Sequence, residues 1–361
     1  MSAKTITISH SSSQTSLATL PPELLLEIIP QISYSPKSLL SLILTSRTLH
    51  NLIKSHEYSL TRSITHHQIP QAQPTNYFPS FNQITTFANL STYHTRLQVL
   101  SNLVEKYPSL GTNNKTTNPT THIHHHCPSC STSTLWLLNP RWSTLHKTGL
   151  LLLYRLQDQG SYCHKVALLN GLPAISLACM LLALLAQNRI LRASGILETL
   201  PKIEGNRWWE SSGGGTKEEE ERRRKVIEMR ETEMVCEEMG LKFGVGFYGS
   251  LFEGLALDEC GVQKEGGKES WARKALETEL ASLPYLQTAF FPCCGAPRPP
   301  TLTSCLRRAF AAKCHCQFSE IERKLWEVLS NTALDEVDET LMGKIVRGED
   351  DFGKGGMRRI F

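Results

Sequence analysis

The residues with the clearest metal-binding chemistry lie together in one segment, HIHHHCPSC, at positions 122–130. Two residues separate Cys127 from Cys130, a spacing that lets both sulfurs reach one tetrahedral zinc ion. A structural zinc is therefore one hypothesis, and a solvated polar segment is the alternative, because the histidines lie in low-complexity sequence. The pair supplies only two of four ligands, so the others must come from His124, His126, Cys293, Cys294, Cys305, Cys314, His315 or Cys316.

The sequence gives little support for a catalytic site. The sequence contains no G-x-S-x-G, P-loop or G-x-G-x-x-G motif in a strand-to-helix context. Cys163 and His164 are neighbours in the chain, but a catalytic cysteine and histidine meet through the fold, so their adjacency indicates nothing. Glu237 and Glu238 belong to a charged helical segment and are expected to be solvated. We therefore expect no catalytic residues and no enzyme.

The charge balance argues against a nucleic-acid partner. The 361 residues carry a formal net charge of +4, and 40% of them are hydrophobic. A nucleic-acid interface needs lysine and arginine clustered together. The main basic run, Arg222–Lys225, directly follows the acidic run Glu218–Glu221, which offsets it.

The first sixteen residues, MSAKTITISHSSSQTS, contain no apolar stretch that could form the core of a signal peptide. We therefore expect the protein in the cytoplasm, the nucleus or both. Thiols stay reduced in those compartments, so the 11 cysteines are not interpreted as a disulfide framework.

One apolar segment is nearly long enough to cross a bilayer. Residues 166–186 contain no charged side chain, but Asn170, Gly171 and Pro173 interrupt the first third. The remaining stretch, Ala174–Ala186, has the length of a buried core helix. We therefore favour a core helix and keep membrane association as the alternative.

The hydrophobic pattern predicts a mainly α protein with an N-terminal three-helix module and an irregular α-rich domain with disordered insertions. That domain is expected to be built around Leu150–Leu197. Charged sequence from Glu218 to about Met239 predicts a further helix, in which acids precede bases by four residues and Gly240 marks the stop. The expected boundaries are a disordered start at 1–16, the module at 17–64, a linker at 65–84, the α-rich domain at 85–348 with flexible segments 111–121 and 206–222, and a tail at 349–361.

Other helices are expected at 93–107, 270–283 and 319–346, where apolar residues recur at helical spacing. Strands are not excluded around 241–257. No internal repeat is found.

The N-terminal module has clear helix signals. Pro21 and Pro22 suit the first turn of a helix, which Pro30 then ends. Ser35 before Pro36 predicts a second helix, and Thr45 or Ser46 can cap a third. Three short helices cannot bury so many leucines among themselves, so an exposed apolar surface should remain for a partner.

This run resembles the F-box family. The family pattern is Leu-Pro, an acidic residue, spaced apolar positions, a leucine-rich middle helix and a closing Ser-Arg with apolar residues. Here the corresponding residues are Leu20-Pro21, Glu23, Leu24, Ile28, Leu39-Leu40, Leu42, Ser46-Arg47, Leu49 and Leu52-Ile53. The resemblance covers about a tenth of the chain. It departs from the family at Pro30, which shortens the first helix, and at Leu49, where an aromatic residue is common.

The resemblance implies a substrate-recruiting adaptor of a Skp–cullin–F-box ubiquitin ligase, in the ubiquitin-conjugation and protein-degradation pathway. The F-box would dock on the Skp-type linker, and through it on a cullin, and the rest of the chain would bind an unknown protein substrate. The short module with a long unclassified C-terminal region is reminiscent of fungal F-box proteins. A zinc-stabilised interaction module unrelated to ubiquitin and a membrane-associated helical protein stay open as alternatives. The residues that the resemblance turns toward the linker are Leu20, Pro21, Leu24, Ile28, Leu39 and Leu42.

Overall fold

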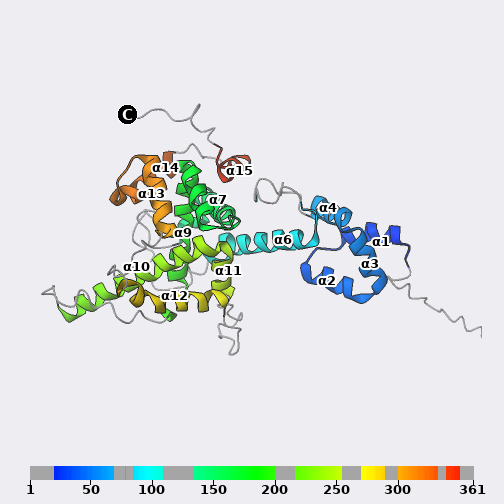
Figure 1. The fold of residues 1–361 in the computed structure, drawn as a ribbon, viewed down its shortest axis with the longest axis horizontal. Helices are drawn as coiled ribbons and strands as arrows, with labels where there is room; N and C mark the ends of the chain where they lie inside the picture. Colours follow the sequence, from blue (N-terminus) through cyan, green and yellow to red (C-terminus); the bar gives the residue numbers. More distant parts are fainter. Residues whose placement is uncertain are drawn as a thin grey trace, which may run out of the picture. The chain divides into compact units, whose positions relative to one another are not determined.

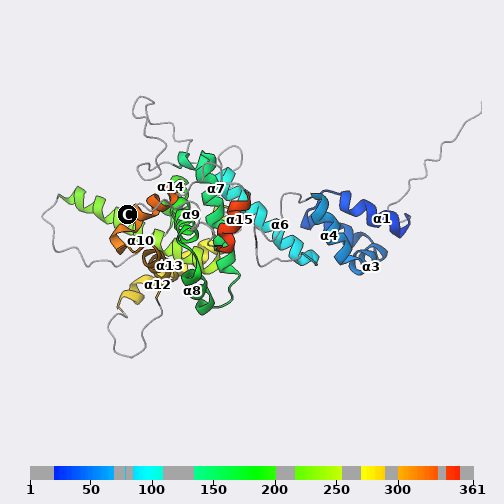
Figure 2. The same ribbon diagram turned by 90° about the horizontal axis from the view of Figure 1, so that it is seen from above.

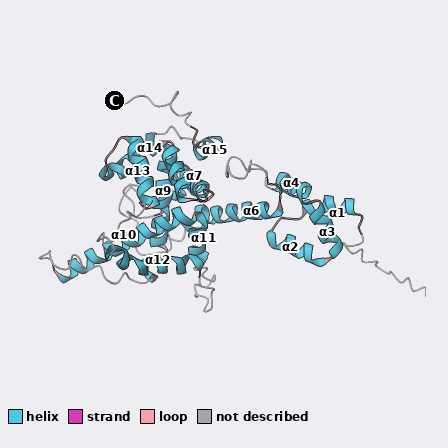
Figure 3. Cartoon of the chain, in the orientation of Figure 1, coloured by secondary structure: helices cyan, strands magenta, loops and turns pink. Residues whose placement is uncertain are grey.

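The structure is a computed structural model in which every regular element of the described residues is helical, which confirms the mainly α prediction (Figure 3). By contacts between residues, the chain divides into two compact units. The N-terminal unit contains residues 1–73 and 83–95, and the C-terminal unit contains residues 74–82 and 96–361. The predicted disorder at 1–16, the flexible segment 111–121 and most of the tail lie outside the described residues. The described residues are 20–68, 78, 84–108, 134–200, 216–253, 270–288, 300–331 and 339–349.

The N-terminal unit follows the predicted helix signals closely. Its first helix starts at a proline and passes into a single 3₁₀ turn that contains Pro30. The side chains of Ser35 and Ser46 accept backbone N–H groups at the starts of the next two helices. The elements are α1 (Pro22–Ile28), η2 (Ile29–Gln31), α2 (Pro36–Thr45), α3 (Arg47–Ser55), α4 (Glu57–Gln68) and the first part of α6 (Phe87–Ser101) (Figure 1).

Two boundaries of this unit differ from the prediction. Helix α4 adds a fourth helix that continues to Gln68, past the expected module end at 64. Residues 83–95 group with this unit, although the α-rich domain was expected to begin at 85. The reason is that Phe87 packs on the core cluster of Ile29, Ile53 and Leu60. Its backbone N–H also donates to the Glu57 carboxylate at 2.8 Å.

The C-terminal unit is organised around α7 (Pro140–Gln157) and α9 (Ala174–Ala193), which pack side by side (Figure 2). Their close approach depends on Gly149, where a Cβ atom would lie 2.0 Å from the carbonyl oxygen of Cys179. Helix α9 is long and apolar enough to cross a membrane, but most of it is buried inside this unit. In the structure it is a core helix, as we expected.

Shorter helices surround this pair. The remaining elements are η3 (Asn102–Lys106, a π-helical turn), η5 (Leu135–Leu138), α8 (Tyr162–Gly171), η6 (Ile196–Thr199), α10 (Lys217–Phe243), α11 (Val245–Glu253), α12 (Trp271–Thr288), α13 (Leu302–Cys314), η7 (Phe318–Glu320), α14 (Ile321–Asn331) and α15 (Glu339–Arg347). Helix α13 packs on α8 and α9, α14 packs on α9, and α15 packs on α7. Helix α10 contacts α7, α9, α11, α12 and α13.

The charged helix α10 begins within one residue of its expected start at Glu218 but ends later than expected. It begins at Lys217, with Thr216 as its N-cap, so the expected flexible segment 206–222 extended too far and is helical from residue 217 on. It also passes through Gly240 and ends before Gly244, whose φ of 79° favours glycine. Gly240 is needed for packing, because a Cβ atom there would lie 2.3 Å from the hydroxyl oxygen of Tyr248. The stretch 241–257, for which strands were not excluded, is helical at 241–243 and 245–253, and its last four residues lie outside the described residues.

Candidate partner-binding surface

Helix α1 separates its apolar side chains into two faces. Leu25 is 4% exposed and Ile29 is buried, whereas Leu24 is 45% exposed and Ile28 is also exposed. Residues four apart lie on the same face of a helix, so Leu24 and Ile28 form one outward stripe. Ile32, just after η2, is exposed as well. We call Leu24, Ile28 and Ile32 the α1 patch.

Helix α2 has no buried residue at all. Leu40 is 57% exposed and Leu44 is 76% exposed, and their spacing of four again places them on one face. We call these two residues the α2 patch. Sequence reasoning missed both, because leucine and isoleucine cover more than half of the circumference of this helix and the periodicity alone cannot choose an outer face.

The six residues that the resemblance turned toward a partner are not equivalent in the structure. Leu24, Ile28 and Pro21 are exposed, and Leu20 is half-buried. Leu39 and Leu42 are partly buried and pack against the unit's own core cluster. The most exposed apolar side chains of α2 are therefore those of the α2 patch, and Leu39 and Leu42 offer less surface than the resemblance implied.

The end of α4 fixes the segment that carries Ile32. The side-chain amide of Gln68 donates to the carbonyl oxygens of Pro30 and Ile32, both at 2.6 Å. Its carbonyl oxygen accepts the backbone N–H of Tyr34 at 2.6 Å. These three hydrogen bonds to one side chain fix the backbone after η2, in a conformation that leaves the side chain of Ile32 exposed to solvent.

Charges of opposite sign lie on neighbouring elements of this unit. Glu23 and Glu27 are exposed on α1, next in sequence to the apolar residues of the α1 patch. The ammonium of Lys54 on α3 lies 3.1 Å from the Glu57 carboxylate. The hydrogen bond from the Phe87 backbone, helped by Lys54, holds the pKa of Glu57 below its usual value. Because the exposed carboxylates of Glu23 and Glu27 lie beside the α1 patch, the patch suits a partner that offers an apolar groove with basic groups at its edge.

The proposed metal ligands Cys127 and Cys130 lie outside the described residues, as do Cys293 and Cys294. Within the part of the chain that the structure describes, no group of three or more His, Cys, Asp or Glu side chains could hold a metal ion. Cys314, His315 and Cys316, named above as further ligands, form no such group. The zinc hypothesis stays a prediction.

A second candidate site is a groove of about 870 Å³ in the C-terminal unit, between α8, α10, α12 and α13. Its apolar wall includes Met234, Leu302 and Phe318. The ammonium of Lys165 lies at its edge and donates to the carbonyl oxygens of Leu241 and Lys242 at 3.1 and 2.7 Å. This charge is therefore used to bind the C-terminal end of α10 to α8.

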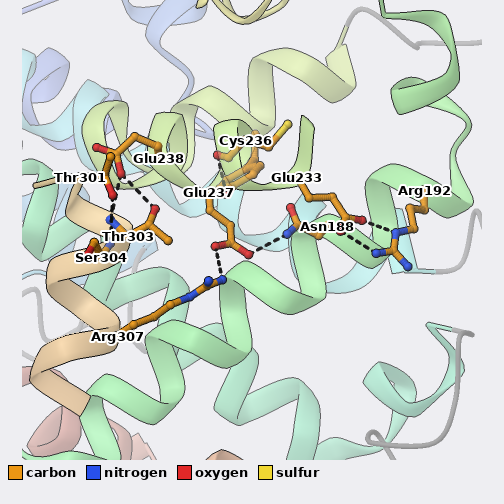
Figure 4. A network of polar contacts seen from close by, with 11 residues as sticks. Asn188, Arg192, Glu233, Cys236, Glu237, Glu238, Thr301, Thr303, Ser304 and Arg307 are labelled. Carbon is orange, nitrogen blue, oxygen red and sulfur yellow. Dashed lines mark hydrogen bonds and ion pairs between the residues drawn. The ribbon is translucent and has the colours of Figure 1, made fainter. Parts of the chain in front are cut away.

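Carboxylates of α10 hold the neighbouring helices beside this groove (Figure 4). Glu238 accepts the backbone N–H groups of Leu302 and Thr303 at 3.0 and 2.9 Å, so it caps the start of α13. Glu237 accepts bonds from Asn188 of α9 at 3.0 Å and from Arg307 of α13 at 2.9 Å. One turn earlier, Glu233 binds the guanidinium of Arg192 through two contacts, one of them 2.6 Å long. Three successive carboxylates thus bind α10 to α9 and α13.

Burial changes the acidity of this network. It raises the pKa of Glu237 above its ordinary value, and Arg307 opposes that shift. The described groove residues contribute their polar groups mostly to bonds between helices. We therefore interpret the polar groups around the groove as structural contacts between helices, beside an apolar wall. The N-terminal unit remains the strongest candidate binding surface.

Comparisons with family models, curated proteins and solved structures found no match to this chain.

Proposed function

We propose that this protein is a substrate-recruiting adaptor whose N-terminal unit docks on the Skp-type linker of a Skp–cullin–F-box ubiquitin ligase. The observation that carries the proposal is the outward stripe of Leu24 and Ile28 on α1, whose remaining leucines, Leu25 and Leu26, are buried or pack against the unit's own core. Both residues of the stripe are among the six that the F-box resemblance turns toward the linker.

The energetics favour coverage of this stripe by another protein. Burying a Leu or Ile side chain completely contributes about 1.5–3 kcal/mol, so covering the exposed parts of Leu24 and Ile28 contributes roughly 1–2 kcal/mol together. The α2 patch would add to this if one partner reaches both helices. A short helix that lays an apolar stripe into a groove is a common mode of protein recognition.

Under this proposal the protein acts without catalysis, in the cytoplasm or nucleus. The linker would connect it to a cullin, and the C-terminal unit would hold the protein substrate. The groove between α8, α10, α12 and α13 offers an apolar wall for such a contact.

The test is capture of the full chain from cells, followed by mass spectrometry of the proteins that come with it. We expect a Skp-type linker and a cullin among them. The paired change Leu24→Asp and Ile28→Asp should remove both, because it places two charges in the stripe that docks.

A matched control is Met234→Asp with Phe318→Asp, since both residues are exposed and apolar but belong to the C-terminal unit. The control should still capture the linker. The proposal is wrong if the wild-type chain captures no linker, or if both double variants capture it equally well.

A further inference from the structure

The first turns of α10 form an exposed arm, which we define as residues 218–227 (Figure 1, Figure 2). Every side chain from Glu218 to Ile227 is exposed, and the helix becomes partly covered from Glu228 and buried at Glu233. Val226 is 49% exposed, and Ile227 beside it is also exposed. The surface of the arm is therefore not covered by its own unit, and part of that surface is apolar.

The charges of the arm follow one another in two blocks. Four glutamates, 218–221, are followed by four basic residues, 222–225. Successive residues of an α-helix are rotated by about 100°, so four in a row encircle the axis. Every face of the arm therefore presents negative charge in its first turn and positive charge in the next.

This order makes the arm complementary to a second copy of itself. In an antiparallel pair, the glutamate block of one arm lies beside the basic block of the other, and the reverse holds at the other end. In a parallel pair, like charges would face each other. An antiparallel pair is also two-fold symmetric, as most homodimer interfaces are.

We propose that the arm is a self-docking surface through which two copies of this chain associate in antiparallel orientation. Ion pairs within each helix already neutralise part of this charge. Lys225 lies 2.8 Å from Glu221, and Arg224 lies 2.8 Å from Glu228. The side chains of Arg224, Lys225 and Glu221 nevertheless remain more than half exposed, so a partner can reach them. Val226 and Ile227 directly follow the basic block and add apolar surface at the edge of the contact.

The association should be weak and sensitive to salt. Exposed ion pairs contribute little individually and are screened over about 8 Å at physiological ionic strength. The full chain should therefore sediment partly as a dimer at low ionic strength and shift toward monomer as salt is added.

Two charge variants give the sharpest test, measured by sedimentation equilibrium of the full chain. The all-acidic variant carries R222E, R223E, R224E and K225E, and the all-basic variant carries E218K, E219K, E220K and E221K. Each variant alone should lose the dimer, because its arms repel each other. An equimolar mixture of the two should restore it as a heterodimer.

The Leu24→Asp, Ile28→Asp background is used throughout, so that contacts through the N-terminal unit do not contribute. Circular dichroism checks that the charge variants keep their helix content. A wild-type arm that stays monomeric at low salt overturns the proposal, and so does a dimer that survives in either variant alone. Failure here leaves linker binding unaffected, because that is measured on the other unit.

Discussion

Leu24 and Leu25 are neighbours in the chain, yet Leu24 is 45% exposed and Leu25 is 4% exposed. Helix α1 turns by about 100° per residue, which carries one leucine out of the core and the other into it. The proposed docking surface depends on this difference, because Leu24 is free to contact a partner whereas Leu25 stabilises the unit's own core.

The first prediction concerns this pair. Leu25→Ala should destabilise the N-terminal unit by roughly 2–4 kcal/mol, because it leaves a cavity in the core. Leu24→Ala should change that stability by less than about 0.5 kcal/mol. Hydrogen exchange of the α3 and α4 amides measures both effects within this unit. Equal effects of the two changes would mean that α1 does not face the core as described.

The sequence predicted the N-terminal unit well wherever local chemistry decides the structure. Proline at the start of α1 and the caps Ser35 and Ser46 act within one helical turn, so their signals can be read without the fold. The exposed leucines of α2 could not be read in this way. Leu39, Leu40, Leu42 and Leu44 are chemically alike, and only the position of the core cluster separates the packed ones from the exposed ones.

The C-terminal end of α10 shows the same limit. Gly240 has the residue type of a helix stop, but it is used to admit the ring of Tyr248, a contact that no local pattern encodes. Glu237 and Glu238 were likewise expected to be solvated. Glu237 is instead buried against Asn188 and Arg307, residues far away in the sequence.

The second prediction tests the contact between α7 and α9. Gly149→Ala should lower the thermal unfolding midpoint, because the new Cβ atom would lie 2.0 Å from the Cys179 carbonyl oxygen and 2.7 Å from the Ala183 Cβ atom. We expect a loss of at least about 1–3 kcal/mol. Gly246→Ala is the matched control, since α11 has open space at that position.

The control should leave the midpoint unchanged or raise it slightly, because alanine favours a helix over glycine by up to about 1 kcal/mol. Differential scanning calorimetry measures both variants. If Gly149→Ala unfolds at the wild-type temperature, α7 and α9 are not in such close contact.

The third prediction concerns acid sensitivity. Burial lowers the pKa of His146 from 6.5 to about 3, and its Nε2 atom lies 2.9 Å from the side-chain nitrogen of Gln187. The unfolded chain binds a proton at this residue below pH 6.5, whereas the folded chain does not. Folding stability is therefore lost as pH falls from 6.5 toward 3, by about 2 kcal/mol between pH 7 and pH 5.

His146→Gln removes the titrating group and keeps a polar side chain of similar size. The difference in unfolding free energy between this variant and the wild type should depend on pH over that window. Denaturant titrations at a series of pH values measure it. Parallel pH profiles for the two proteins would contradict the burial of a neutral imidazole between α7 and α9.

The central claim is tested most directly by calorimetric titration of the full chain with a purified Skp-type linker. We predict that the wild-type chain binds and that the Leu24→Asp, Ile28→Asp variant binds at least about 100-fold more weakly, while the N-terminal unit stays folded. A wild-type chain that does not bind, or a variant that binds with the same affinity, would contradict the assignment of the α1 patch as the docking surface.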